Sequence, residues 1–284
     1  MISVPICQAW TTTQQYHCSP CSSKARTVTT TTVLHAATTA YTLEALDNVD
    51  ADTLRESAAF MMKSFWGLEK YSDGLLSDQM HDFETIYGER IGKRQLASHL
   101  ILARDDNDNG ITGLVGIEVA LLNRSTNDDD NDEPQSKILK YSESEQTLKN
   151  AISSLGPKQR RQYKDATVQE LVSELPDLKG KYEAVIVLAN LAVRGDVRGT
   201  GFGVKLCREA ERIVMDMRNG DDIYRMMLQV EGDNAAAKGL YEKKLGYVQE
   251  WSDEDASALR ADVGGEGTFV EVPCVLLTLG KSVG

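Results

Sequence analysis

Apolar residues recur along this chain at two spacings, which separate helices from strands. Leu54, Ala58 and Met61 follow one another at helical spacing and predict a helix over residues 52–66. A second amphipathic stretch predicts a helix over residues 75–96. Both helices precede the first expected strand.

Short apolar runs between turn signals predict the strands. Residues 100–103 and 113–123 flank the sequence DDNDNG at 105–110, which is typical of a hairpin turn. The run AVIVLANLAV, residues 184–193, is apolar at nearly every position and predicts a buried central strand. Further strands are expected over 225–230, 247–251 and 272–279.

The order of these elements predicts the fold class. Helices over 204–217 and 234–244 separate the later strands, so we expect an α/β domain with a mixed central sheet of about six to seven strands flanked by helices. Residues 124–182 begin with an acidic loop, 127–134, and are then polar and helical, for example over 167–175. We interpret them as an insertion between the third and fourth strands.

The beginning of the chain differs in composition from the rest. From Met1 to Tyr41 there is no Asp or Glu, and Ser and Thr are abundant. Such composition is typical of an organelle transit peptide, and a disordered tail is the alternative interpretation. We divide the chain into a leader, residues 1–43, and one domain, residues 44–284.

Charge and cysteine content exclude several function classes. The net charge of −12 disfavours a nucleic-acid binder, which needs clustered Lys and Arg. No apolar run approaches the roughly 18 residues of a membrane span. Cys18 and Cys21 form a single C-x-x-C pair, and Gly116 stands where an EF-hand starting at Asp105 needs Glu, so no metal site is expected.

A glycine-dense segment follows the predicted central strand. Residues 193–203, VRGDVRGTGFG, lead from the strand into a helix. Glycine lets the backbone approach a ligand closely, and the free amides at the start of a helix bind anions. Arg198 adds a cation for a charge-assisted bond to phosphate. The spacing matches neither a dinucleotide fingerprint nor a P-loop, and it predicts a pyrophosphate site of another kind.

A second segment, residues 229–247, strengthens this interpretation. Asn234 ends a strand where it can cap the next helix, and Gly246 ends that helix. Together the two segments resemble the GNAT superfamily of acetyl-CoA N-acetyltransferases. Its R/Q-x-x-G-x-G/A loop, its N-x-x-A-x-x-L-Y pattern and its closing G-F/Y are matched by Arg198, Gly201, Gly203, Asn234, Ala237, Leu240, Tyr241, Gly246 and Tyr247.

The chain departs from the family at one point of the second motif. Four residues, 242–245, stand between Tyr241 and Gly246, where the family usually has three. We expect the extra residue to distort the end of the helix rather than to move Tyr241. The long insertion is a second departure, and it concerns the substrate side of the site.

The resemblance implies acetyl-CoA as co-substrate, without a metal. Backbone groups of Leu191 and Val193 would pair with the pantetheine arm, and one of these amides would polarise the thioester carbonyl. Tyr241 would protonate the leaving thiolate as general acid. The expected cofactor-binding residues are Leu191, Ala192, Val193, Arg198, Gly199, Thr200, Gly201, Phe202, Gly203, Asn234 and Tyr241.

A base must also take a proton from the attacking amine. Glu118 is the lone charge inside an apolar strand, and Glu231 lies at the end of a strand near the cofactor segment. Both are candidates, and a chain of waters is the third. Glu118 equally fits a residue that points to solvent.

The resemblance thus predicts acetyl transfer from acetyl-CoA to a primary amine, with a protein N-terminus or lysine favoured. An arylalkylamine or polyamine acceptor and a catalytically silent acyl-CoA-binding module are the alternatives. By similarity to plastid-targeted members, the leader favours the plastid stroma, with the mitochondrion or cytoplasm as alternatives. No nucleic-acid or membrane partner is expected, and the oligomeric state is left open.

We expect the leader to be cleaved in an organelle, between Val33 and Leu43. The reason is its acid-free, hydroxyl-rich composition. Mass spectrometry of the N-terminal peptide of the cellular protein measures this directly. Met1 or Ile2 intact on most of the protein would contradict the prediction.

Overall fold

The computed structural model describes residues 32–36, 39–46, 49–68, 71–88, 96, 98–124, 136–217, 224–261 and 269–283. Most of the predicted leader and the acidic loop at 127–134 lie outside these residues, and so does the Cys18–Cys21 pair.

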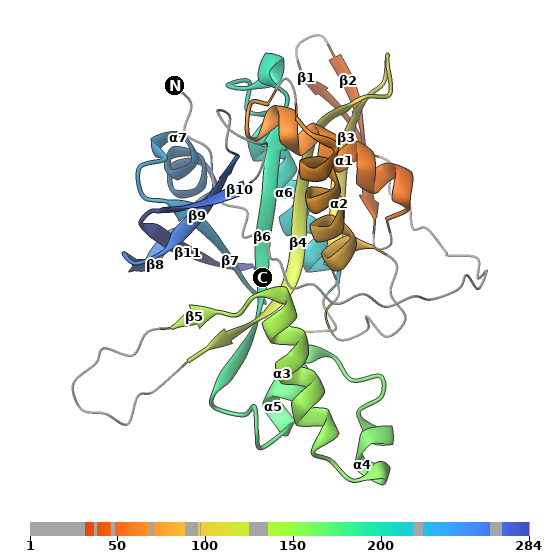
Figure 1. Cartoon of the computed structure of the whole chain (residues 1–284), viewed down its shortest axis with the longest axis vertical. Helices are drawn as coiled ribbons and strands as arrows, with labels where there is room; N and C mark the ends of the chain where they lie inside the picture. Colours follow the sequence, from red (N-terminus) through yellow and green to blue (C-terminus); the bar gives the residue numbers. More distant parts are fainter. Residues whose placement is uncertain are drawn as a thin grey trace.

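Nine of the described strands form one mixed sheet (Figure 1). Its order is β1-β2-β3-β4-β6-β7-β11-β8, and β5 pairs with β4 beside this path. Only the pair β6–β7 is parallel. The strands are β1 Thr32–Ala36, β2 Thr39–Leu46, β3 Ser98–Asp105, β4 Ile111–Asn123, β5 Lys137–Ile138, β6 Tyr182–Val193, β7 Tyr224–Glu231, β8 Val248–Asp253 and β11 Leu276–Val283. The predicted mixed α/β sheet is confirmed, with more strands than the six to seven expected.

Helices cover both faces of this sheet, with α1 and α2 in front and α6 behind it in Figure 1. The helices are α1 Ala51–Ser64, α2 Asp73–Tyr87 and α6 Phe202–Asp216. The second helix ends well before the predicted residue 96. Its C-cap is Gly88, where the backbone becomes extended, and glycine disfavours a continuing helix.

The two faces of the sheet carry separate apolar cores, and β3 shows how one strand serves both. Its side chains alternate, so Ile101 and Ala103 pack on the α6 side while Leu100 and Leu102 pack on the side of α1 and α2. A strand that is covered on both faces is apolar at every position. This explains the uninterrupted run that predicted a strand here.

The sheet begins before the predicted domain boundary at residue 44. β2 pairs with β3 from Tyr41 to Leu46. The side chains of Tyr41 and Leu43 are buried, and the Tyr41 ring lies 4.6 Å from that of Phe202. The expected cleavage between Val33 and Leu43 falls within β1 and β2, and it stays a prediction.

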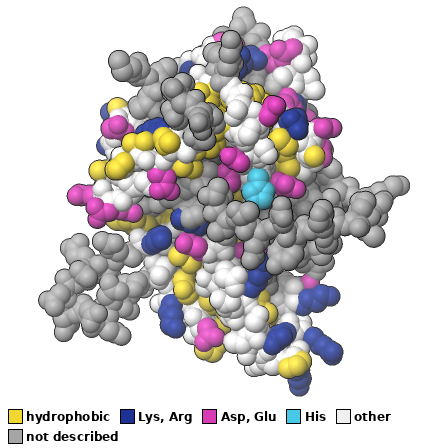
Figure 2. Space-filling model, in the orientation of Figure 1, with side chains coloured by type: hydrophobic (Ala, Val, Ile, Leu, Met, Phe, Trp, Pro, Cys, Tyr) yellow, Lys and Arg dark blue, Asp and Glu magenta, His cyan; other side chains and the backbone are white. Residues whose placement is uncertain are grey.

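The insertion lies at the expected residues but between β4 and β6, and not between the third and fourth strands, because β1 and β2 precede the strands that the sequence predicted. It contains β5 and three helices, α3 Tyr141–Ser153, α4 Pro157–Gln162 and α5 Val168–Glu174. Leu148 and Leu171 centre a small core that also packs on Leu121 of β4 and Ala184 of β6. These apolar contacts anchor the insertion to the sheet. Figure 2 shows Lys and Arg side chains gathered over this end of the molecule.

The predicted final strand over 272–279 is wrong, because two strands share that range. β10 Phe269–Pro273 pairs with β9 Ser257–Ala261 in a separate two-stranded sheet, whereas β11 lies between β7 and β8. Pro273 has no amide hydrogen for a ladder, and it is the last residue of β10.

Candidate functional site

The site is built around β6, which separates from the parallel strand β7 towards its C-terminal end. β6 pairs with β4 over its whole length, but among the described residues it pairs with β7 only at Ile186–Met226 and Val187–Met227. Beyond Val187 the two strands diverge. Asn190 has a φ of 56°, in the left-handed region, beside a register shift in the pairing with β4. This bulge re-aims the end of β6.

A groove of about 640 Å³ lies along the last residues of β6. Its walls are the end of β6, the glycine loop with the start of α6, and the segment that begins at Asn234. The groove brings together most of the predicted cofactor residues: Leu191, Ala192, Val193, Arg198, Gly199, Gly201, Phe202, Gly203 and Asn234. Thr200 is outside this lining, and its hydroxyl donates to the Val197 carbonyl at 2.7 Å. Thr200 thus holds the loop in shape.

The glycine loop presents the start of α6 to the groove. Gly199 and Gly201 have φ angles of 77° and 86°, and Gly201 is the N-cap of α6. The groove lining continues through Phe202 to Val204, the first helical turn. Backbone amides of that turn have no partner within the helix, and the helix dipole adds positive potential. This geometry fits a bound pyrophosphate.

Arg198 is held by two backbone carbonyls at the edge of the groove. Its Nε donates to Val193 at 2.9 Å, and its Nη2 donates to Ser64 at the end of α1. The side chain therefore ties the loop to β6 and to α1. Its positive charge remains at the groove, where a phosphate would benefit from it.

The second motif forms a short helix that changes its winding. The side chain of Asn234 caps α7 Ala235–Lys238 by accepting from the Ala237 amide at 3.0 Å. The chain continues as a π-helix, Gly239–Leu245, and ends at Gly246 with a φ of 76°. A π-turn holds one more residue than an α-turn. The end of the helix is distorted, as expected, but the wider winding begins at Gly239, so the expectation that the distortion would come after Tyr241 is wrong.

Tyr241 lies in the core on the α6 side, next to Tyr247, with the ring centroids 6.0 Å apart. Leu240 lines the groove, whereas Tyr241 is not among the lining residues. Burial, with a smaller effect of Cys207, raises the pKa of Tyr241 well above its usual value. The hydroxyl is therefore protonated at neutral pH, as a general acid requires. Its contact with the reacting sulfur stays a prediction.

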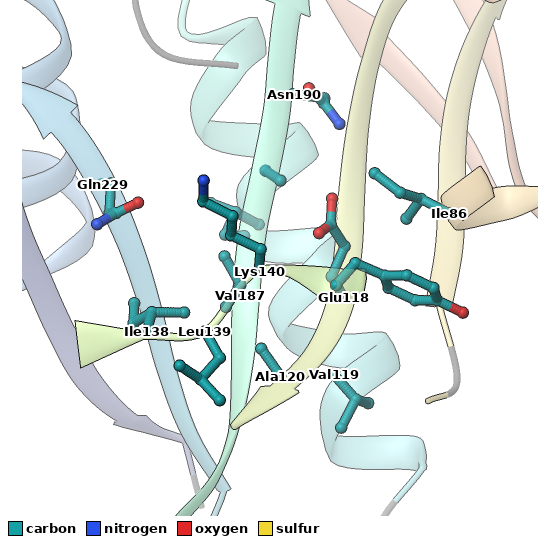
Figure 3. Close-up of a pocket in the computed structure, with 13 residues that line it drawn as sticks. Ile86, Glu118, Val119, Ala120, Ile138, Leu139, Lys140, Val187, Asn190 and Gln229 are labelled. Carbon is teal, nitrogen blue, oxygen red and sulfur yellow. The ribbon is translucent and has the colours of Figure 1, made fainter. Parts of the chain in front are cut away.

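A second cavity, of about 100 Å³, lies along the preceding residues of β6. β6 contributes residues 187–190 to this cavity and residues 191–193 to the groove. Figure 3 shows the polar side chains around the cavity: Glu118 from β4, Asn190 from β6, Gln229 from β7 and Lys140 from the insertion. We call it the acceptor cavity, because its lining on β6 begins where the lining of the groove ends, between residues 190 and 191.

Glu118 is the ionisable carboxyl group of the acceptor cavity. Its Oε1 accepts a hydrogen bond from the Tyr87 hydroxyl at 2.8 Å. Burial raises the pKa of Glu118 to about 7, and the bond from Tyr87 opposes that rise. A carboxyl group with this pKa can take up and release a proton near neutral pH. Glu118 therefore lines a cavity with a titratable side chain, and its role as the base stays a prediction.

Tyr87 and Asn190 complete a hydrogen-bonded chain that the sequence analysis missed. The side-chain amide of Asn190 donates to the Tyr87 hydroxyl at 2.9 Å. Tyr87 fits here because residue 116 is glycine, since a Cβ at Gly116 would overlap the Tyr87 hydroxyl. Asn190 was detectable as the single polar residue inside an apolar run. Tyr87 carried no signal, because only the fold brings it to Glu118.

The second predicted base, Glu231, has a different environment. Both of its carboxylate oxygens accept from the Arg260 guanidinium, Oε1 from Nη1 at 2.5 Å. The side chain is 1% exposed and lines neither the groove nor the acceptor cavity. Glu231 joins β7 to β9 through a buried ion pair, and we do not retain it as a base.

The described residues contain no cluster of three or more His, Cys, Asp or Glu side chains suited to a metal ion. None of the helices in this part of the chain is long and apolar enough to cross a membrane.

Comparisons with known proteins agree with the motifs. Residues 172–247 match the model of the acetyltransferase (GNAT) family. No curated protein matches the sequence. The resemblance to the GNAT family is thereby confirmed for the segment that contains both motifs.

Several solved structures resemble the chain at low sequence identity. One is the ribosomal-protein-S18-alanine N-acetyltransferase from Escherichia coli, with 12% identity, a TM-score of 0.41 and coverage of 86% of this chain and 94% of that one. Another is arylalkylamine N-acetyltransferase 2 from Aedes aegypti, with 15% identity, a TM-score of 0.42 and coverage of 85% and 99%. A third is NAA60 from Arabidopsis thaliana in complex with acetyl-CoA, with 12% identity, a TM-score of 0.39 and coverage of 86% and 98%.

We predict that Gly201→Asp abolishes binding of CoA to the groove. The left-handed backbone at this position costs a non-glycine residue about 1–2 kcal/mol, and the new carboxylate repels phosphate. We expect the affinity to fall at least about a hundredfold, or roughly 3 kcal/mol, in calorimetry with CoA.

The matched control is Gly195→Asp. Gly195 lies in the same loop, has open space around it and does not line the groove. Its variant should bind CoA like the wild type. Equal affinity of Gly201→Asp and wild type would show that the loop does not bind the phosphates.

Proposed function

We propose that this chain, whose residues 172–247 form a GNAT acetyltransferase core, transfers an acetyl group from acetyl-CoA to a primary amine. One observation carries the proposal: β6 runs directly from the groove, with its anion-binding loop, to the cavity that holds Glu118. A cofactor with its phosphates at residues 201–204 and its arm along residues 191–193 would end at Asn190. The reacting centre would then lie at the mouth of the acceptor cavity.

The residues of the groove fit such a cofactor. Amides of the first turn of α6 face the phosphate end, and the small residues Ala235 to Ala237 leave room on the opposite wall. Residues 188–193 of β6 have no pairing to β7 among the described residues, so backbone groups on that side can bind an extended arm. Acetyl-CoA supplies the acetyl group as a thioester.

In the proposed reaction, Glu118 takes a proton from the acceptor amine, whose lone pair then attacks the thioester carbon. The amide of Leu191 or Val193 donates to the carbonyl oxygen as negative charge develops there. The C–N bond forms, the C–S bond breaks, and Tyr241 gives its proton to the sulfur. The acceptor begins as an ammonium group, so its nitrogen loses a second proton to solvent after the C–S bond breaks, and Tyr241 takes up a proton from solvent.

The acceptor in this proposal is a primary amine of a peptide or protein, and a small-molecule amine is the alternative. We also propose that the protein works in an organelle, with the plastid stroma favoured by the composition of the leader.

The test is incubation of the full chain with acetyl-CoA and a panel of peptides, arylalkylamines and polyamines. Mass spectrometry identifies any acetylated product, and free CoA thiol reports turnover. Binding of CoA without turnover on any amine would support the silent binding module instead.

We predict that Glu118 sets the pH dependence of turnover. The catalytic constant should rise as the pH passes through about 7, because Glu118 is a base only when ionised. Tyr87→Phe removes a bond that lowers this pKa, so the midpoint should move to higher pH. Glu118→Gln should lower turnover about a hundredfold to ten-thousandfold at neutral pH.

Tyr71→Phe is the matched control, because Tyr71 does not line the acceptor cavity. It should leave the midpoint unchanged. The acceptor amine also titrates, but Tyr87→Phe does not change the pKa of the amine. A shifted midpoint in this variant would therefore show that the titrating group is Glu118. An unshifted midpoint in Tyr87→Phe would contradict the assignment.

We predict that Tyr241→Phe loses turnover far more than cofactor affinity. The phenyl ring retains the packing, and the lost hydroxyl is needed mainly as the thiolate forms. We expect the catalytic constant to fall about a hundredfold to ten-thousandfold, with CoA affinity within a few-fold of wild type. Tyr247→Phe, in the neighbouring ring of the same core, is the control and should retain turnover. Normal turnover of Tyr241→Phe would show that another group protonates the sulfur.

A further inference from the structure

We propose that Lys140 selects the acceptor, and that the preferred acceptor is a primary amine with a carboxylate or another anion close to it. The inference rests on the proposed acetyl transfer, and it assigns a substrate class to the same site. It is carried by the position of one cation inside the acceptor cavity.

The backbone around Lys140 is fixed on both sides. Before it, β5 pairs with β4, and the Leu139 amide donates to the Leu121 carbonyl at 2.8 Å. At Lys140 itself, the amide donates to Glu143 Oε2 at 3.0 Å, and the carbonyl accepts from the Ser144 amide at 2.8 Å. The insertion therefore holds Lys140 at a defined place beside the sheet.

The side chain of Lys140 lines the same cavity as Glu118 (Figure 3). Among the described residues, Glu118 and Lys140 are the only charged residues in the cavity lining, which also contains the neutral side chains of Asn190 and Gln229. Burial lowers the pKa of Lys140, and the charges of Glu143, Lys137 and Glu271 act on it from outside the lining. The ammonium group of Lys140 therefore adds a positive charge to the side of the cavity that faces Glu118.

The two charges define the ligand that fits between them. An amine placed against Glu118 gains its base, and an anion close to that amine would accept a charge-assisted hydrogen bond from Lys140. A second cation on the acceptor would instead meet Lys140, and like charges disfavour such a complex. The pair therefore favours amino-acid-like acceptors over polyamines.

Lys140 is a positive charge at the proposed site of a protein whose net charge is negative. With a net charge of −12, the general field attracts cations, polyamines included. A lysine in the acceptor cavity opposes that field at short range. Free amino acids and peptides with an acidic N-terminal residue share the required chemistry.

The experiment measures kcat/KM of the full chain for acceptor pairs that differ only in the anion. Tyrosine and tyramine form the free pair, peptides that begin with Glu or Gln form the peptide pair, and spermidine is the cationic acceptor. The wild type should prefer the carboxylate member of at least one pair by about tenfold to a hundredfold. The pair that shows the preference identifies the source of the anion.

Lys140→Met should reduce that preference about tenfold or more, and Lys140→Arg should retain most of it. Lys137→Met is the matched control, because Lys137 is exposed on β5 and does not line the cavity. CoA affinity and the melting temperature show whether each variant is folded. If Lys140→Met does not fold, the inference is tested by whether the wild type prefers the carboxylate member of the acceptor pairs.

An unchanged preference in folded Lys140→Met would overturn the inference, and so would a wild type that prefers tyramine or spermidine. Either result would leave the proposed acetyl transfer intact. No turnover on any acceptor would instead refute the proposed function, which keeps the two failures apart.

Discussion

The separation of β6 from β7 is the constraint on which the rest of the site depends. A central strand that leaves its neighbour exposes backbone donors and acceptors inside the protein, and unpaired buried groups are costly. The cost is acceptable where a ligand can supply the missing partners. The bulge at Asn190 and the glycine loop fix where the opening begins and ends, so the groove has a defined length and direction.

The two ends of this opening carry opposite electrostatic roles. At the loop end, the first turn of α6 and Arg198 provide positive potential for an anion. At the other end, Glu118 is kept titratable near neutral pH by burial and by a bond from Tyr87. Tyr87 comes from α2 and Asn190 from β6, so three elements position the proposed base, and its environment belongs to the tertiary structure.

This difference explains which parts of the site were predictable from sequence. The loop around Gly201 and the cap at Asn234 are local features, whose function follows from a few adjacent residues. The contact between Tyr87 and Glu118 joins residues 31 positions apart and has no local signature. Glu231 illustrates the converse, because its place at a strand end suggested chemistry while Arg260, far along the chain, neutralises it. Two strands were also not predicted correctly. β2 was assigned to the leader because of its Ser/Thr-rich composition, and the end of β10 at Pro273 was missed because the apolar pattern continues past it.

The π-helix connects the motif to the chemistry in a way that spacing alone does not reveal. Asn234 and Gly246 fix the two ends of the segment, so one extra residue between them must be absorbed by wider winding. The wider turn retains Leu240 in the groove and places Tyr241 in the core beside Tyr247. Burial in that core keeps the Tyr241 hydroxyl protonated, so the same packing that removes the ring from the groove lining maintains it as a proton donor. The proposed acid therefore depends on the winding of this helix, whereas the proposed base depends on the contact between α2 and β4.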